Sequence, residues 1–162
     1  RTSSELRDLL DEYHKEYEDL LPKTKTHYFP GIEDLLHYLD KAKVPWGIVT
    51  NKPGFLTDKL LANFSLAISP ACVVSGDTTE HAKPHPAPLF KACSLIGVKP
   101  EKCIFIGDHE RDIIAGRAAG MKTIAVSFGH IADDYDIASW QADAIINEGE
   151  KILPLIKQWK NI

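Results

Sequence analysis

The chain has 162 residues, of which 44% are hydrophobic and 26% are charged, and these values are typical of one soluble globular domain. Nineteen Lys and Arg against 23 Asp and Glu give a formal net charge of −4, which excludes the large basic face that duplex nucleic acid requires. The apolar runs are too short to span a membrane. We therefore expect neither a nucleic-acid partner nor a membrane partner, and the composition indicates no oligomeric state.

Three cysteines, Cys72, Cys93 and Cys103, lack the paired spacing that disulfide frameworks and zinc sites use. Cys72 and Cys103 lie in apolar runs, where a reduced cysteine packs like a small hydrophobic residue. We therefore expect free thiols in the core and a reducing, cytoplasmic location.

Two amphipathic segments open the chain. Leucines and tyrosines recur every three or four residues over 6–20, which predicts a helix that ends before Pro22. Thr2 and Glu5 have the spacing of a capping box at its start. The same periodicity predicts a second helix over about 31–43.

From residue 44 the pattern changes to short apolar runs that end in polar or glycine-rich turns. Such runs, alternating with helical stretches, are typical of a parallel sheet with helices on both faces, so the sequence predicts an α/β fold with three Rossmann-like layers. The predicted strands are 44–50, 72–75, 103–106 and 123–126, with an edge strand at 143–146. The predicted helices are about 54–64, 86–96, 110–119 and 150–160. Gly97 and Gly120 stand where two of these helices would stop in a left-handed conformation.

Ligands bind at the carboxyl ends of the strands in such sheets, and two acidic residues follow one predicted strand there. Asp108 leaves the strand 103–106 and Asp112 lies four residues on, so both carboxylates can face one point. They suit Mg²⁺, which takes one or two carboxylates and keeps several waters. The alternative is that Asp108 caps the next helix and Asp112 is solvated. Arg111 is expected to be a surface charge.

Two other strand ends carry candidate phosphate ligands. Thr50 and Asn51 offer a hydroxyl and an amide, which can hold phosphate oxygens, although both residue types are ordinary in turns. Lys83 is followed by three prolines at alternate positions. This stiff segment predicts a fixed charge for a phosphate, rather than the alternative of a solvated surface lysine. Asp77 is better explained as a loop cap than as a ligand.

The order and spacing of these motifs resemble the haloacid dehalogenase superfamily of phosphatases. Thr50-Asn51, Lys83-Pro84 and the G-D-x-x-x-D of residues 107–112 are similar to its second, third and fourth motifs. Segments that look like its phosphoglycolate phosphatase branch are VVSGD at 73–77, AKPHPAPL at 82–89 and AGRAAGM at 115–121. Segments that are similar to N-acetylmuramic acid 6-phosphate phosphatases are TNKP at 50–53 and HAKPH at 81–85.

The resemblance implies Mg²⁺-dependent hydrolysis of a phosphomonoester through an aspartyl-phosphate. It implies a small phosphorylated metabolite as partner, either a sugar phosphate or a hydroxyacid phosphate. The residues to which it gives roles are Thr50, Asn51 and Lys83 for phosphate binding, Lys83 also for catalysis, and Asp108 and Asp112 for the metal. It further implies that residues 1–22 are the remnant of a helical cap and that 23–162 are the core domain.

The sequence lacks the family's first motif, D-x-D-G-T, which supplies the nucleophile at the end of the first strand. Asp134-Tyr135-Asp136 has a similar spelling but follows no apolar strand, so residues 133–136 are interpreted as a solvated turn. In the family the first strand lies between the strand that ends at Thr50 and the one that ends at Gly107. A gap of about 10 Å, twice the usual strand spacing, is therefore expected in the sheet.

Three explanations of the gap are open: its neighbours close up, another chain fills it, or the sequence is a piece of a longer protein. We expect the third, and we expect no phosphatase turnover from these 162 residues alone. The alternative functions are a shortened pseudo-phosphatase that binds phosphate and Mg²⁺ without turnover, and a phosphomutase of the same superfamily. A dinucleotide-binding sheet is disfavoured because no G-x-G-x-x-G follows a predicted strand.

Overall fold

The computed structural model of the chain describes residues 3–21, 25–128 and 136–159 and has the α/β fold that the sequence predicts. The helices are α1 (Ser3–Leu20), α2 (Ile32–Lys41), α3 (Gly54–Asn63), α4 (Ala87–Ile96), α5 (Glu110–Ala118) and α6 (Ile152–Gln158). The strands are β1 (Gly47–Val49), β2 (Cys72–Val74), β3 (Ile104–Gly107), β4 (Lys122–Val126) and β5 (Ala144–Ile146). Short 3₁₀ helices cover Pro100–Lys102, Ile137–Trp140 and Gly149–Lys151.

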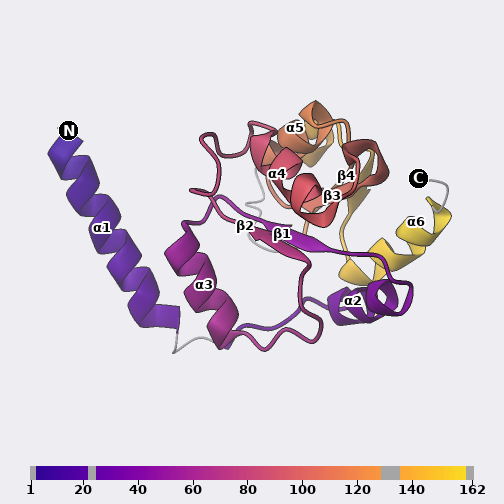
Figure 1. Cartoon of the computed structure of the whole chain (residues 1–162), viewed down its shortest axis with the longest axis horizontal. Coiled ribbons are helices and arrows are strands. Elements are labelled where there is room, and N and C mark those ends of the chain that lie inside the picture. Colours follow the sequence, from indigo (N-terminus) through magenta and orange to yellow (C-terminus); the bar gives the residue numbers. More distant parts are fainter. Residues whose placement is uncertain (1–2, 22–24, 129–135, 160–162) are drawn as a thin grey trace.

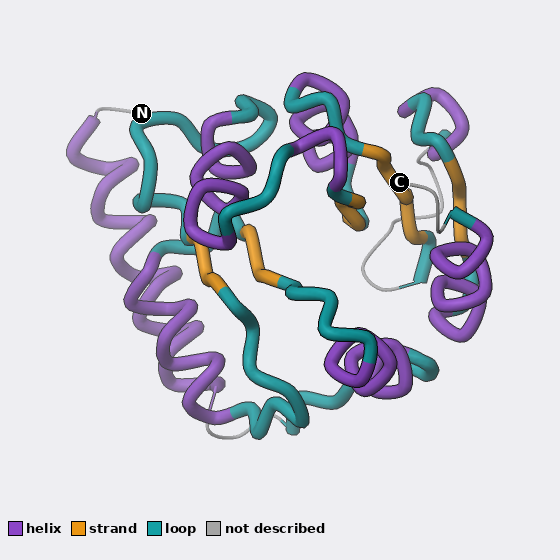
Figure 2. Tube along the Cα trace, turned by 45° about the vertical axis from the view of Figure 1, so that its right-hand side comes forward, coloured by secondary structure: helices purple, strands orange, loops and turns teal. Residues whose placement is uncertain are grey.

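The described strands form two parallel sheets. β1 pairs with β2, while β3 pairs with β4 and β4 with β5. β1 and β3 are not paired with each other in the described chain, and Figure 2 shows two separate groups of strands. The neighbours of the expected gap therefore do not close up.

The two edges that border this gap are apolar and incompletely covered. Every residue of β3 is half-buried, whereas β4 has four buried residues in a row. A parallel strand with a continuous apolar run is normally covered on both faces. Val49 of β1 and Phe105 of β3 pack against the same buried cluster of α4 and α5. β1 and β3 are thus the facing edges of the two sheets.

Helices cover both faces of the three-stranded sheet. Leu35 of α2 and Ile152 of α6 pack with Ile124 on one face. Ile113 of α5 packs with Ala125 on the other face, because successive side chains of a strand point to opposite sides. Figure 1 shows α4 and α5 on one side of the strands and α2 and α6 on the other. The three-layer prediction is therefore confirmed, with the sheet divided in two.

The ends of the predicted elements differ from the observed ones by a few residues. Gly97 and Gly120 follow α4 and α5 with φ of 75° and 76°, which confirms the predicted left-handed stops. The strand predicted over 44–50 is observed only as β1, over Gly47–Val49. The Val44 amide donates to the Leu39 carbonyl (2.9 Å) and so continues the turn after α2.

α1 forms the first predicted helix, but most of its apolar face is exposed. Leu6, Leu9, Leu10, Tyr13 and Leu20 are all between 46% and 59% exposed. The capping residue predicted at position 2 and most of the predicted acidic turn lie outside the described residues. No described helix, α1 included, is long and apolar enough to cross a membrane.

All three cysteines are free, as the sequence predicts, and the predicted burial is confirmed for Cys72 but is only partial for Cys103. Cys72 and Cys93 are buried, Cys103 is half-buried, and the Sγ atoms of Cys93 and Cys103 lie 3.8 Å apart. Burial and the neighbouring Cys103 raise the pKa of Cys93 to about 12. Burial also raises the pKa of Cys72.

We expect Cys93 to be unreactive toward iodoacetamide in the folded protein at about pH 8. A thiol with a pKa of about 12 carries almost no thiolate at that pH, and the thiolate is the reactive form. Peptide mass spectrometry should find Cys93 alkylated only after unfolding in urea. Rapid modification of Cys93 in the native protein would contradict this expectation.

Candidate active site

A hollow of about 400 Å³ lies where the carboxyl ends of β1 and β3 meet the start of α5, and we call it the site pocket. Its lining residues are Tyr13, His14, Thr50, Asn51, Lys52, Pro53, Leu56, Lys83, Asp108, Arg111 and Asp112. All five side chains that the sequence singles out as site candidates are among them. Residues that are up to 62 positions apart in the chain thus converge on one place, because parallel strands end at the same edge.

Lys83 is buried and held in a fixed position. It is 9% exposed, and its Nζ donates to the Val49 carbonyl (2.7 Å) and lies 2.8 Å from Oδ1 of Asp112. The Phe105 ring centre lies 5.3 Å from the same nitrogen. The alternative of a solvated surface lysine is therefore wrong. The ammonium group connects the end of β1 with the first turn of α5.

The Asn51 side chain forms hydrogen bonds with both backbone polar groups of Lys83, its carbonyl and its amide. Its Nδ2 donates to the Lys83 carbonyl (2.7 Å), and its Oδ1 accepts from the Lys83 amide (3.0 Å). One hydrogen of Nδ2 stays available for a ligand, because an amide nitrogen carries two. The neighbouring Thr50 hydroxyl accepts from the Lys52 amide (3.1 Å) and keeps its own hydrogen for donation.

Asp112 is buried beside a glycine that makes room for it. The residue is 5% exposed, and Oδ2 of its carboxylate accepts from the His109 amide (3.2 Å). A Cβ at Gly107 would lie 2.3 Å from the Cβ of Asp112, so no larger residue fits there without movement. The alternative that Asp112 is solvated is therefore wrong.

Asp108 is exposed at the mouth of the site pocket. The residue that caps α5 is His109, so the alternative that Asp108 caps this helix is also wrong. Within residues 3–21, 25–128 and 136–159, Asp108 forms no ion pair or hydrogen bond. Its carboxylate is free to bind a ligand that enters the pocket.

These two carboxylates fit a magnesium ion. Oδ1 of Asp112 is buried and, apart from its ion pair with Lys83, accepts no hydrogen bond from the described residues. Mg²⁺ usually takes one or two carboxylates and completes its shell with water and substrate phosphate oxygens. The described chain offers no cluster of three or more acidic, His or Cys ligands, so a cation held entirely by protein is not indicated there.

α1 forms one wall of the site pocket through its contacts with α3 and the segment before it. The Nζ of Lys52 lies 3.9 Å from the centre of the Tyr17 ring, and the His14 and Phe55 rings meet edge to face at 5.4 Å. These contacts bring Tyr13 and His14 to the pocket. Sequence reasoning missed Tyr13 and His14 as pocket residues, because nothing in the helical periodicity of α1 indicates which helix it docks on. It also missed Arg111 of α5, which was interpreted as a surface charge.

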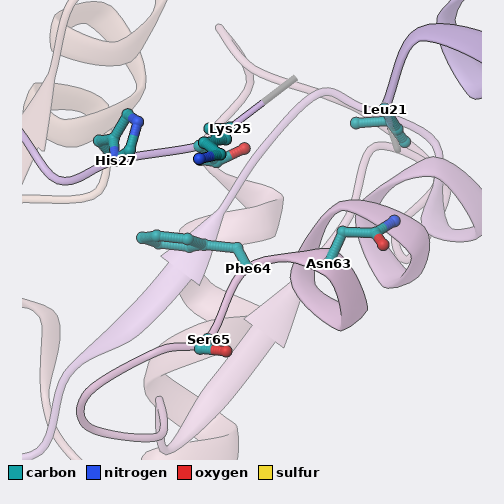
Figure 3. A pocket seen from close by; sticks show the side chains of 7 residues that line it. Leu21, Lys25, His27, Asn63, Phe64 and Ser65 are labelled. Carbon is teal, nitrogen blue, oxygen red and sulfur yellow. The ribbon is translucent and has the colours of Figure 1, made fainter. Parts of the chain in front are cut away.

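A second hollow, of about 440 Å³, lies at the other end of α3, about 15 Å along the helix. Figure 3 shows Lys25 and His27 on one wall, with Asn63, Phe64 and Ser65 on the other. Its lining contains no carboxylate. It therefore lacks the acidic ligands that the proposed metal requires, and the site pocket is the candidate active site.

Asp77 has a capping role, as the sequence predicts, but the backbone group that it caps lies at the start of a helix rather than in its own loop. Its two carboxylate oxygens accept from the Gly54 amide at 3.0 and 3.1 Å. Gly54 begins α3, where amide groups lack partners within the helix and the helix dipole is positive. The carboxylate of Asp77 therefore stabilises the start of α3, next to the site pocket.

Replacing this cap is expected to weaken the fold modestly. Asp77→Ala should lower the free energy of unfolding by about 1 kcal/mol, because α3 loses an acceptor at its first turn. Urea unfolding measures the change. Asp58→Ala, at an exposed position within α3, is the matched control and should change stability by less than about 0.5 kcal/mol. Equal losses in the two variants would contradict the capping role.

Known proteins resemble this chain in sequence. A sequence profile of the haloacid dehalogenase-like hydrolases matches residues 1–126. A phosphoglycolate phosphatase of Xanthomonas campestris pv. campestris is 43% identical over 140 residues, which are 86% of this chain and 63% of that protein. An N-acetylmuramic acid 6-phosphate phosphatase of Pseudomonas aeruginosa is 35% identical over 154 residues, 95% of this chain and 68% of that protein.

The fold is also similar to solved structures. The structure of a predicted phosphoglycolate phosphatase from Haemophilus somnus 129PT matches with a TM-score of 0.84 at 25% identity, over 96% of this chain and 68% of that one. In the sequence comparison, this chain spans 63% of the length of the Xanthomonas phosphoglycolate phosphatase. The family expected from the motif order is the one found by these comparisons.

Proposed function

This chain belongs to the haloacid dehalogenase-like hydrolase family, and we propose that it supplies most of the active site of a Mg²⁺-dependent phosphomonoester hydrolase. The observation that carries the proposal is that two neutral donors, a buried ammonium group and two carboxylates line one pocket. Phosphoryl transfer depends mainly on positioning and on neutralising charge, and these groups provide both. Residues 1–22 are proposed as the remnant of a helical cap and 23–162 as the core.

Each side chain has a proposed role in that reaction. Thr50 and the free Nδ2 hydrogen of Asn51 donate to the oxygens of the transferring phosphoryl group. The Lys83 ammonium group neutralises the phosphate and the carboxylate that attacks it. Asp108 and Asp112 hold Mg²⁺, which when bound would withdraw charge from the phosphate oxygens.

The proposed reaction transfers the phosphoryl group twice. A carboxylate attacks phosphorus, the bond from phosphorus to the ester oxygen breaks, and the leaving oxygen takes a proton from the second Asp of D-x-D-G-T, so that an alcohol is released. Water then cleaves the acyl phosphate, which releases inorganic phosphate and restores the carboxylate. The carboxylate belongs to the D-x-D-G-T motif, which these 162 residues do not contain.

The substrate class that fits the site pocket is a small phosphorylated metabolite. A volume of about 400 Å³ is near the lower end for small-molecule sites and suits a sugar phosphate or a hydroxyacid phosphate. The relatives are named for phosphoglycolate and for N-acetylmuramic acid 6-phosphate, and both compounds belong to this class.

Calorimetric titration with inorganic phosphate tests the metal and phosphate roles without any turnover. The chain should bind phosphate at least about tenfold more tightly with Mg²⁺ than with EDTA. Asp108→Asn should lose this difference and keep the binding seen in EDTA. Asp58→Asn, at an exposed position on α3, should behave like the unchanged chain. Phosphate binding that ignores both Mg²⁺ and Asp108→Asn would contradict the proposed site.

A further inference from the structure

Two of the three cysteines lie in contact although they belong to different parts of the fold. Cys93 lies in the last turn of α4, and Cys103 immediately precedes β3. Their Sγ atoms are 3.8 Å apart, and we call them the cysteine pair. Neither residue lines the site pocket, and neither has a role in the proposed phosphatase chemistry. Both thiols are free, so the pair is available for chemistry of its own.

Packing and backbone contacts hold the cysteine pair together. Cys93 is 5% exposed and lies in the same buried cluster as Leu89, and Cys103 packs against this cluster. The 3₁₀ helix Pro100–Lys102 ends directly before Cys103, whose Sγ donates to the Lys99 carbonyl (3.4 Å). A disulfide bond of about 2.05 Å requires the two sulfurs to approach by less than about 2 Å, a shift on the scale that side-chain rotation provides.

The two thiols of the pair differ in access and in acidity. Cys103 is half-buried, whereas Cys93 is buried. Burial and the neighbouring Cys103 raise the pKa of Cys93 to about 12, so its thiol is protonated and shielded from solutes. Oxidants react with the thiolate of a cysteine that solvent reaches. Cys103 is therefore the thiol that an oxidant meets first, and Cys93 is the second partner.

We infer that Cys93 and Cys103 are a modification site, at which hydrogen peroxide closes a reversible disulfide bond that ties α4 to β3 and stabilises the fold. The Cys103 sulfur attacks the peroxide, the O–O bond breaks, and Cys103 becomes a sulfenic acid while water leaves. The Cys93 sulfur then attacks the Cys103 sulfur and the S–O bond breaks. The Cys93 proton departs with that oxygen as a second water.

These steps balance and need no reactant besides the peroxide. The peroxide gains two electrons and the two thiols lose two. The contact between the sulfurs compensates for the small thiolate fraction of Cys93, because no diffusional encounter is required. A dithiol such as dithiothreitol reverses the bond by thiol–disulfide exchange. The inference does not depend on the proposed function.

Tryptic peptides separate the three cysteines. Trypsin cuts after Lys and Arg except before Pro, so Cys72, Cys93 and Cys103 fall in peptides 60–91, 92–102 and 103–111. The folded chain is treated with hydrogen peroxide, and its free thiols are then blocked. Mass spectrometry without reduction should find 92–102 joined to 103–111, and dithiothreitol should release the two peptides. The melting temperature should be roughly 5–10 °C higher while the bond is present, because the bond restricts the unfolded chain.

Cys103→Ser and Cys72→Ala are the matched variants. Cys103→Ser removes the thiol that reacts first and should abolish both the joined peptides and the rise in melting temperature. Cys72→Ala removes a buried thiol outside the pair, whose Sγ donates to the Ala92 carbonyl (3.9 Å), and should keep both.

Four results would overturn the inference. The first is that peptides 92–102 and 103–111 stay separate in the oxidised unchanged chain, and the second is that either of them is joined to 60–91 instead. The third is a covalent dimer on a non-reducing gel, which would place the bond between two copies of the chain. The fourth is a melting temperature that the bond leaves unchanged. Phosphate binding by the reduced chain tests the proposed function separately.

Discussion

Supplying an apolar strand that ends in D-x-D-G-T is expected to give this chain phosphatase turnover, which we do not expect from the 162 residues alone. In the experiment, the added segment is fused before Arg1 through further residues of a helical cap, or it is coexpressed as a separate chain. Hydrolysis of a chromogenic phosphomonoester in Mg²⁺ should rise by at least roughly 100-fold, because the reaction gains its nucleophile.

The two sheet edges give the physical reason for this expectation. β1 and β3 run in the same direction, since Thr50 after β1 and Asp108 after β3 line the same pocket. Val49 and Phe105 pack on one cluster from either side, and β3 is half-buried throughout. A parallel strand between them would cover apolar side chains and satisfy unpaired backbone groups.

The same strand would also end beside the buried cation. The Nζ of Lys83 is bonded to the Val49 carbonyl at the end of β1, so a carboxylate that follows the added strand would lie near this ammonium group. The control segment carries Asn in place of the first Asp of the motif and should fill the gap without turnover. Turnover with this control, or equal turnover by the 162 residues alone, would contradict the assignment. Phosphate binding without turnover in the complemented protein would favour the pseudo-phosphatase.

The parts of the site that follow from strand order could be predicted from the sequence. An apolar run that ends in a polar residue places that residue at the carboxyl edge of a parallel sheet, and this rule located Thr50 and Asp108. The proline-rich flank of Lys83 indicated a fixed side chain. Its burial and its partners come from tertiary packing, since Val49 and Asp112 lie 34 and 29 positions away.

Other contacts carry no local signal in the sequence. Asn51 forms two hydrogen bonds with the backbone of Lys83, which lies 32 positions away. The sequence does not indicate them, because asparagine is also common in ordinary turns that follow strands. Arg111 has the sequence context of any exposed helix residue, although it lies in the first turn of α5, one position before Asp112. His109 rather than Asp108 caps α5, and the carboxylate of Asp112 accepts a hydrogen bond from the His109 amide.

Replacing the buried lysine by an apolar side chain is expected to destabilise the fold strongly. Lys83→Met leaves the carboxylate of Asp112 charged and buried without its partner, since both side chains are at most 8% exposed. Removing one member of a buried ion pair costs about 3–5 kcal/mol, and urea unfolding in EDTA should show a loss of this size. Lys59→Met is the control. Lys59 forms an exposed pair with Glu18, which is worth less than about 1 kcal/mol.

A second substitution separates lost pairing from lost packing. Adding Asp112→Asn to Lys83→Met removes the unpaired charge and should recover more than half of the lost stability, because the penalty resides in the carboxylate. Mg²⁺ should also stabilise Lys83→Met more than the unchanged chain, since a bound cation compensates the same carboxylate. A loss below about 1 kcal/mol in Lys83→Met, or no recovery in the double variant, would show that the ammonium group does not neutralise Asp112.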